Sequence, residues 1–314
     1  MALSSTFCET LLNVFGSTMS LMRILFAIPH YFVRSGTGAH GSEDGSAKRR
    51  AQIVGGCLAG LQQNFAESQG LLDGRGGLRM HAANADLSAT ITIALCTTGD
   101  SHLVPELEGC PFNHIRTNAE PVYLGFECHK LLRSGLGRYD WFAYLEDDLR
   151  LTDGLFFRKL AWFNGTFGDQ AVLQPNRFEI VGEPAPYKLY IDGNLADPSI
   201  TPALQRIEEE RHVEATALGQ RIAFQRIDNP HSGCFFLNAA QFARWAEQPD
   251  FAVPSARLFG PLESAASLGI AQYFRVYKPA RENAAFLEVE HLDRRFLGRM
   301  FEPVPGEPSA LRRR

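Results

Sequence analysis

Short apolar runs alternate along the first half of the chain with segments in which apolar residues recur at helical spacing. The runs predict strands at 23–29, 88–98 and 140–145, and the helical segments lie at 47–65 and 121–136. Ser46 is a candidate N-cap for the first of these helices. Strands separated by helices are typical of an α/β fold with a mixed, mostly parallel sheet flanked by helices.

The second half is richer in strand-like segments. Apolar or alternating patterns favour strands at 171–181 and 188–193, and 211–227 favours extended or mixed structure. Two further apolar segments follow at 274–280 and 284–292. The stretch 229–248 predicts a strand that leads into a helix, and a last helix is expected to start at Pro261-Leu262-Glu263. We therefore expect one domain over 22–300, an N-terminal extension at 1–21 and a disordered, proline-rich tail at 301–314.

Composition narrows the class of protein. With 314 residues, 45% of them hydrophobic and 21% charged, the chain is long enough for a large globular domain. The net charge of −4 argues against a nucleic-acid-binding protein, which would carry a basic excess. Six scattered cysteines without a C-x-x-C pair indicate thiols in a reducing compartment.

The N-terminal segment does not resemble a targeting signal. Residues 1–21 lack a basic start and contain Glu9 and Asn13, and no later window approaches the roughly eighteen apolar residues that a spanning helix needs. We expect a cytoplasmic protein without a transmembrane segment. Peripheral attachment to the inner face of the membrane remains open.

The strand at 140–145 ends in three carboxylates, Glu146-Asp147-Asp148. Burying an isolated carboxylate costs several kcal/mol, so this triplet requires a cation, hydrogen-bond donors or water. In α/β sheets, ligands bind at the carboxyl ends of strands, and Mg2+ or Mn2+ takes oxygen ligands that bridge well to phosphates. The triplet therefore predicts a nucleotide-diphosphate and metal site, although a solvated acidic turn, or Asp148 as a cap, explains the same residues.

Two long connections, 29–46 and 66–86, are expected to be binding loops. Residues 36–41 match G-x-G-x-x-G, but they do not follow the first strand directly, so they do not form a dinucleotide fingerprint. The basic run Lys48-Arg49-Arg50 could contact the oxygens of a diphosphate. A solvated helix face is the ordinary alternative for such a run.

Four motifs occur in an order that resembles the GT-A glycosyltransferases. The E-D-D triplet resembles a variant of their D-x-D motif, and "HSGCFFLNAAQF" at 231–242 resembles their acceptor-side segment. "FGPLESAASLG" at 259–269 resembles the helix start that carries the catalytic carboxylate of inverting members. His291 resembles the late histidine that completes the metal site. The resemblance covers about 22–297 and implies a GT-A type, Rossmann-like fold.

The resemblance implies a metal-dependent glycosyltransferase of the hexosyltransferase type. It would move a sugar from a nucleotide-diphosphate donor, most naturally a UDP-sugar, to a glycan or lipid-linked acceptor, as in polysaccharide biosynthesis. In this scheme 22–150 binds the nucleotide-sugar, and 151–300 supplies the acceptor and catalytic side. Asp148 and His291 would hold Mn2+ or Mg2+, and Glu263 would be the general base of an inverting reaction.

The resemblance also implies a set of donor-binding residues, with either Glu146 or Asp147 on the ribose. These residues are His30, Lys48, Arg49, Glu146, Asp147, Ser232 and Gly233. Two positions depart from the family pattern: Glu146 replaces the first Asp of the triplet, and Ser264 stands where many inverting members have a second acid after the base.

Each assignment has an alternative. Glu263 could only favour a helix N-terminus, and His291 could be a packed histidine. A nucleotidyltransferase would use a similar sheet and similar acids, but it would normally place a glycine-rich, basic loop close to the first strand. A non-catalytic nucleotide- or carbohydrate-binding module would keep the fold without turnover.

Overall fold

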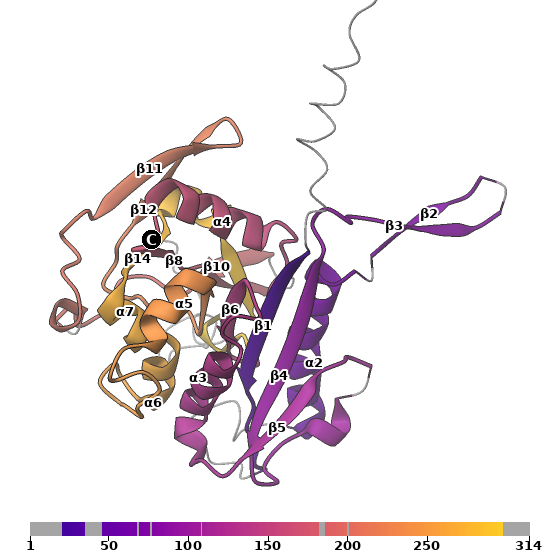
Figure 1. Ribbon diagram of the computed structural model, residues 1–314, viewed down its shortest axis with the longest axis horizontal. Helices are drawn as coiled ribbons and strands as arrows, with labels where there is room; N and C mark the ends of the chain where they lie inside the picture. Colours follow the sequence, from indigo (N-terminus) through magenta and orange to yellow (C-terminus); the bar gives the residue numbers. More distant parts are fainter. Residues whose placement is uncertain are drawn as a thin grey trace, which may run out of the picture.

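The computed structural model describes residues 21–34, 46–67, 69–75, 77–107, 109–181, 186–199 and 201–297. Within these ranges it has the expected architecture, a mixed, mostly parallel sheet flanked by helices (Figure 1). Residues 1–20 of the expected extension, the glycine-rich match at 36–41 and the expected tail at 301–314 lie outside the described residues.

A five-stranded sheet in the order β13-β6-β1-β4-β5 forms the centre of the molecule. Its strands are β1 (Met22–Pro29), β4 (Ala89–Thr98), β5 (Asn113–Thr117), β6 (Trp141–Leu145) and β13 (Cys234–Asn238). β1 is parallel to both β4 and β6, β4 is parallel to β5, and β13 is antiparallel to β6. The strands expected at 23–29, 88–98 and 140–145 are confirmed, and β13 brings a strand of the second half into this sheet.

Helices cover both faces of the central sheet. In the described ranges, the α-helices of four or more residues are α2 (Ala47–Phe65), α3 (Leu124–Ser134), α4 (Phe156–Phe167), α5 (Ala239–Ala246) and α7 (Gly269–Tyr273). Ile24, Phe26 and Ile28 of β1 pack in a core cluster with residues of α2 and α4, whereas Leu25 and Ala27 pack with residues of α3 and α5. Burial on both faces explains why β1 is a continuous apolar run rather than an alternating one.

The expected helix starts are confirmed. Ser46 caps α2, because its Oγ accepts a hydrogen bond from the Arg49 N–H at 3.1 Å. The last helix starts at α6 (Pro261–Glu263), continues as the π-helical turn η4 (Ser264–Leu268) and ends in α7. The 3-10 helices are η1 (Val104–Glu106), η2 (Pro121–Tyr123), η3 (Thr201–Ala203) and η5 (Arg281–Phe286).

Two smaller sheets pack beside the central one. The first, in the order β10-β9-β15-β7, contains β10 (Tyr187–Tyr190), β9 (Asn176–Val181), β15 (Glu288–His291) and β7 (Leu149–Arg150). The second, in the order β11-β12-β14-β8, contains β11 (His212–Ala217), β12 (Gln220–Gln225), β14 (Arg275–Pro279) and β8 (Ala171–Leu173). The segment 211–227, expected to be extended or mixed, contains the β-hairpin of β11 and β12.

The connection at 66–86 differs from expectation. It contains the hairpin of β2 (Gly70–Asp73) and β3 (Arg79–Ala82), which projects from the body of the molecule (Figure 1). None of its described residues lines the pocket at the carboxyl end of β6. Among the helices of the described residues, none is long and apolar enough to cross a membrane.

Candidate functional site

Strand pairing brings the acidic triplet together with two other chain segments. β1 and β6 are aligned with Ala27 opposite Tyr144, so His30 lies beside Asp147 just beyond the two strand ends. A pocket of about 270 Å³ opens at this end of the sheet. It is lined by residues of both halves of the chain, including Arg50, Glu146, Asp147, Asp148, Arg177, His231, Glu263 and His291.

Asp147 is buried, and both of its carboxylate oxygens have hydrogen-bond partners. Its Oδ2 lies 2.6 Å from Nδ1 of His30, and its Oδ1 accepts a hydrogen bond from the Arg50 guanidinium. Nε2 of His30 accepts the N–H of Leu103 at 2.9 Å, so Nδ1 is the nitrogen that donates to Asp147. Both oxygens of this carboxylate are therefore occupied by protein groups.

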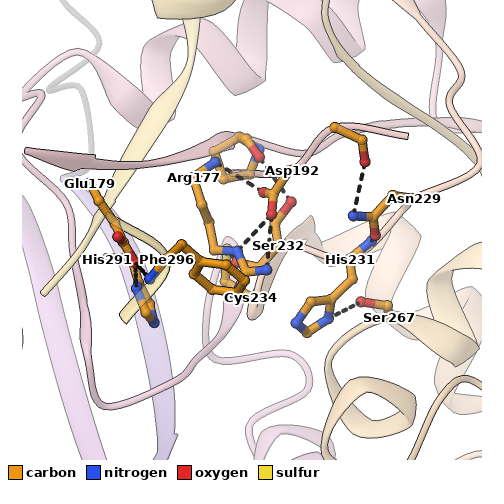
Figure 2. A network of polar contacts seen from close by, with 12 residues as sticks. Arg177, Glu179, Asp192, Asn229, His231, Ser232, Cys234, Ser267, His291 and Phe296 are labelled. Atoms are coloured by element: carbon orange, nitrogen blue, oxygen red, sulfur yellow. Dashed lines mark hydrogen bonds and ion pairs between the residues drawn. The ribbon is translucent and has the colours of Figure 1, made fainter. Parts of the chain in front are cut away.

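Asp148 has different surroundings. Its Oδ2 lies 3.6 Å from Nε2 of His291, whereas its Oδ1 is buried and has no hydrogen-bond partner among the described residues. Nδ1 of His291 lies 2.7 Å from Oε1 of Glu179 (Figure 2). Burial lowers the pKa of His291, but Asp148 and Glu179 outweigh it and raise that pKa to about 9. Burial opposes ionisation of Asp148, yet His291 and Arg50 hold its pKa well below the usual range.

The first small sheet positions this pair. His291, at the end of β15, is opposite Leu149 of β7, and the Leu292 N–H donates to the Asp148 carbonyl at 2.8 Å. The same strand β15 is parallel to β9, which carries Glu179. Three strands thus bring Asp148, His291 and Glu179 together.

Glu146 projects into the pocket at the point where β13 meets β6. Burial, and next the charge of Asp148, raise its pKa to about 8, so the carboxyl is largely protonated at neutral pH. Gly233 has φ +63°, and a Cβ at this position would lie 2.4 Å from Oε2 of Glu146. A glycine at 233 therefore allows the Glu146 carboxyl to pack against the backbone.

Glu263 lines the same pocket at the start of the last helix and is near enough to contribute to the raised pKa of Glu146. Ser264 is buried, and its Oγ accepts the Leu258 N–H at 3.0 Å. Ser264, which the sequence resemblance places where many inverting GT-A glycosyltransferases have a second acid, thus fixes the preceding loop through this hydrogen bond.

Five of the seven donor-binding residues expected from sequence do not line the pocket, and only Glu146 and Asp147 of that set do. His30 and Gly233 lie behind the pocket, against Asp147 and Glu146 respectively. Lys48 and Arg49 are exposed on α2, where Arg49 contacts the Asp293 carbonyl at 3.2 Å. Ser232 is fully buried, and its Oγ donates to the Pro175 carbonyl at 2.8 Å. The third member of the basic run, Arg50, is the one whose side chain points inward.

The sequence assigned no role to Glu179, Arg177, Asp192 or His231, all of which belong to this site or directly support it. Arg177 and His231 line the pocket, and Asp192 binds Arg177 through hydrogen bonds of 2.9 and 3.0 Å. His231 opens the acceptor-side segment at 231–242, but that segment gave it no role, and no motif marks the other three residues, because each becomes significant only through its long-range partner.

Asp148 and His291 fit a divalent metal. In the described ranges, no group of three or more His, Cys, Asp and Glu residues could hold a metal, so a metal on this pair would need further ligands from substrate or water. Mg2+ is commonly held by one or two carboxylates together with substrate phosphates and water, and Mn2+ also accepts imidazole. The unpartnered Oδ1 of Asp148 and the Glu179 contact that orients His291 are features of such sites.

Comparisons with known proteins give only weak likenesses. No protein-family model matches the chain, and no curated protein matches it. Residues 1–349 of S. aureus TarS share 9% identity at a TM-score of 0.41, covering 87% of this chain and 61% of that one. The same TarS fragment in complex with UDP shares 11% at 0.40, covering 82% and 57%.

CMP:2-keto-3-deoxy-manno-octonic acid synthetase complexed with CTP shares 10% identity at a TM-score of 0.34, covering 82% of this chain and 89% of that one. The chain spans about three fifths of the length of the TarS fragment. Likenesses of this size do not establish a function, so the functional case depends on the site itself.

Proposed function

We propose that the chain is a metal-dependent glycosyltransferase that moves a sugar, a hexose in the simplest case, from a nucleotide-diphosphate donor such as a UDP-sugar to a hydroxyl of a glycan or lipid-linked acceptor. One observation carries the proposal: Asp148 and His291 converge at a strand end, with an unpartnered carboxylate oxygen, in a pocket that also contains Glu263. Cytoplasmic synthesis of a polysaccharide is the setting that this proposal favours.

For the donor, Glu146 is better placed than Asp147 to contact the ribose. Both oxygens of Asp147 already bind His30 and Arg50, whereas the Glu146 carboxyl faces the pocket. A carboxyl that is protonated at neutral pH can donate as well as accept a hydrogen bond, which suits a sugar hydroxyl. Asp147 would then hold Arg50 and His30 in place.

For the chemistry, Glu263 would accept the proton of the acceptor hydroxyl as that oxygen attacks the anomeric carbon from the face opposite the diphosphate. A metal held by Asp148 and His291 would supply positive charge to the departing diphosphate. A single displacement of this kind inverts the anomeric configuration. Because Ser264 is a buried serine, Glu263 is the carboxylate that this helix start offers to the pocket.

The first test is incubation with UDP-, GDP- and CMP-sugars, with and without Mn2+, followed by detection of the released nucleotide. Release of nucleoside diphosphate that requires Mn2+ is the expected result. A nucleotidyltransferase would instead release pyrophosphate from a nucleoside triphosphate and a sugar phosphate. A protein that binds a nucleotide-sugar without releasing nucleotide would be a binding module, and the proposed function would be wrong.

The second test is Glu263→Gln. A general base contributes little to donor binding, so turnover should fall by about a hundredfold or more while donor affinity stays at the parental value. If Glu263 only stabilised the helix start, the change would cost a few tenths of a kcal/mol of stability and leave turnover almost unchanged. Glu282→Gln is the matched control, because Glu282 is an exposed carboxylate in the first turn of η5, outside the pocket.

Product stereochemistry, determined by NMR, gives an independent check of the same assignment. Inversion of the anomeric carbon is expected. Retention would show that Glu263 is not the base of a single displacement, whatever the turnover of the Glu263→Gln variant.

A further inference from the structure

Two buried side chains from the C-terminal half of the chain line the pocket, and each has one nitrogen without a hydrogen-bond partner among the described residues. Arg177 and His231 are each only 8% exposed, and both line the pocket. Among the described residues, Nη1 of Arg177 and Nε2 of His231 make no hydrogen bond or ion pair, although the other side-chain nitrogens of both residues do. Neither atom is sealed from solvent, so both are available to a ligand.

A buried network fixes these two groups (Figure 2). Arg177 binds Asp192 through its backbone N–H and its Nε, at 3.0 and 2.9 Å. Lys278 lies 3.1 Å from the same carboxylate, and its Nζ donates to the His231 carbonyl at 2.6 Å. Nδ1 of His231 lies 3.1 Å from Oγ of Ser267. Both free nitrogens are therefore pre-positioned.

The network carries an excess of positive charge. Asp192 is the carboxylate within ion-pair distance of both Arg177 and Lys278 in the described part of the chain, so one anion serves two buried cations. Glu146 and Asp148 influence Arg177 only from longer range. Since buried charges are normally paired, this arrangement favours a ligand that brings a negative charge to Nη1 of Arg177.

The network is connected to the catalytic side of the pocket. Ser267, which contacts His231, belongs to the π-helical turn η4 that begins directly after Glu263. Short π-helical segments of this kind are frequent at functional sites. His231, which this turn holds through Ser267, therefore lies on the same side of the pocket as Glu263. In the proposed reaction, Glu263 takes a proton from the acceptor, so this is the acceptor side.

We propose that Arg177 and His231 form a subsite for an anionic group of the acceptor, either a carboxylate or a phosphate. That the ligand is the acceptor rests on the proposed function. The guanidinium binds the charged oxygens, and His231 hydrogen-bonds the same group or its neighbouring hydroxyl. The substrate class is then an acidic glycan or a phosphate-containing acceptor rather than a neutral sugar.

The test uses the full chain saturated with UDP and Mg2+, a diamagnetic ion that leaves the NMR signals of the pocket visible, so that the donor's diphosphate region is filled. Inorganic phosphate is then titrated at constant ionic strength and followed by calorimetry and by the side-chain NMR signals of 15N-labelled arginine. Phosphate should bind and shift the Arg177 signal, and Arg177→Gln should weaken phosphate binding by about tenfold or more. Arg150→Gln is the matched control, because Arg150 pairs with Glu290 and does not line the pocket.

Three results would overturn the subsite: an unshifted Arg177 signal, equal phosphate binding by the parent and Arg177→Gln, or a loss of UDP affinity in Arg177→Gln equal to its loss of phosphate affinity. The last would mean that Arg177 binds the donor's diphosphate. If Arg177→Gln does not fold, the Arg177 signal of the parent decides, and Arg177→Lys, which keeps the charge beside Asp192, replaces it in the titration.

Glucose 6-phosphate, glucuronate and glucose separate the possible sources of the anion. Preference for the first indicates a phosphate, preference for the second indicates a carboxylate, and equal binding of all three contradicts the proposal. None of these titrations needs turnover. A failure of nucleotide release would therefore remove the proposed function alone, whereas loss of the phosphate response would remove the subsite alone.

Discussion

Asp147 and Asp148 are neighbours in the sequence and the Arg50 guanidinium is within ion-pair distance of both, yet their other surroundings differ. Asp147 has both oxygens occupied, by the His30 ring and by the Arg50 guanidinium. Asp148 meets His291 at 3.6 Å through one oxygen and has no partner for the other. The Asp147 carboxylate therefore links β1, α2 and β6, whereas the Asp148 carboxylate still has an oxygen that can bind a ligand.

The largest expected effect of breaking this contrast is on stability. Asp147→Asn leaves the buried Arg50 guanidinium without its closest counter-charge, and removing one partner of a buried ion pair typically costs about 3 to 5 kcal/mol. Denaturant unfolding of the parent, Asp147→Asn and Asp148→Asn would measure the difference. Equal losses for the two variants would contradict the view that Asp147 is the structural member.

The next effect is on metal-dependent binding. Asp148→Asn removes the anionic oxygens from the expected metal site, so the affinity for UDP in the presence of Mn2+ should fall by about a hundredfold or more. UDP binding without Mn2+ should change little. Calorimetric titration with and without Mn2+ measures both, and an unchanged Mn2+-dependent affinity would remove Asp148 from the metal site.

The pH dependence sharpens the same contrast. His291 must lose a proton before Nε2 can bind a metal, and its pKa is raised to about 9 by Asp148 and Glu179 against the effect of burial. Asp148 stays ionised throughout this range. Mn2+ affinity should therefore rise by about tenfold per pH unit between roughly pH 6 and 9 and then level off.

The control for this profile is His291→Ala, which should bind Mn2+ more weakly and with a flatter pH dependence. A histidine at its ordinary pKa, near 6.5, would give a profile that levels off about 2.5 units earlier. A flat profile in the parent would show that His291 is not a ligand.

Part of the site is encoded locally in the sequence. The buried positions of α2 include Arg50, Val54, Leu58 and Leu61, which share one helix face, so helical phase alone points Arg50 toward the sheet and Arg49 away from it. The apolar strand before the triplet likewise predicts carboxylates at a strand end. Both inferences need only periodicity within one element.

The rest of the site depends on which strands become neighbours. Glu179 meets His291 because β9 pairs with β15, and these residues are 112 positions apart. Asp192 follows β10 and reaches Arg177 of β9 because these two strands pair in antiparallel fashion, and no motif in the sequence indicates that contact. Alternating apolar patterns predict each strand but not the order of strands in a sheet, so the sequence could not show these partners.

The smallest expected effect tests whether the exposed cations of α2 contribute to the site. Lys48 and Arg49 lie outside the pocket, and exposed charges at such positions are screened by salt, so the Lys48→Gln/Arg49→Gln double variant should change UDP affinity by less than about twofold. Arg50→Gln is the contrasting variant, because it removes a buried charge from Asp147 and should lower both stability and UDP affinity. Calorimetric titration of UDP into the two variants shows whether donor binding depends on the inward-pointing Arg50 or on the exposed positive charges of Lys48 and Arg49. A tenfold loss in the double variant, with Arg50→Gln unchanged, would mean that the outward residues of α2 meet the diphosphate and that Arg50 serves only to fix Asp147.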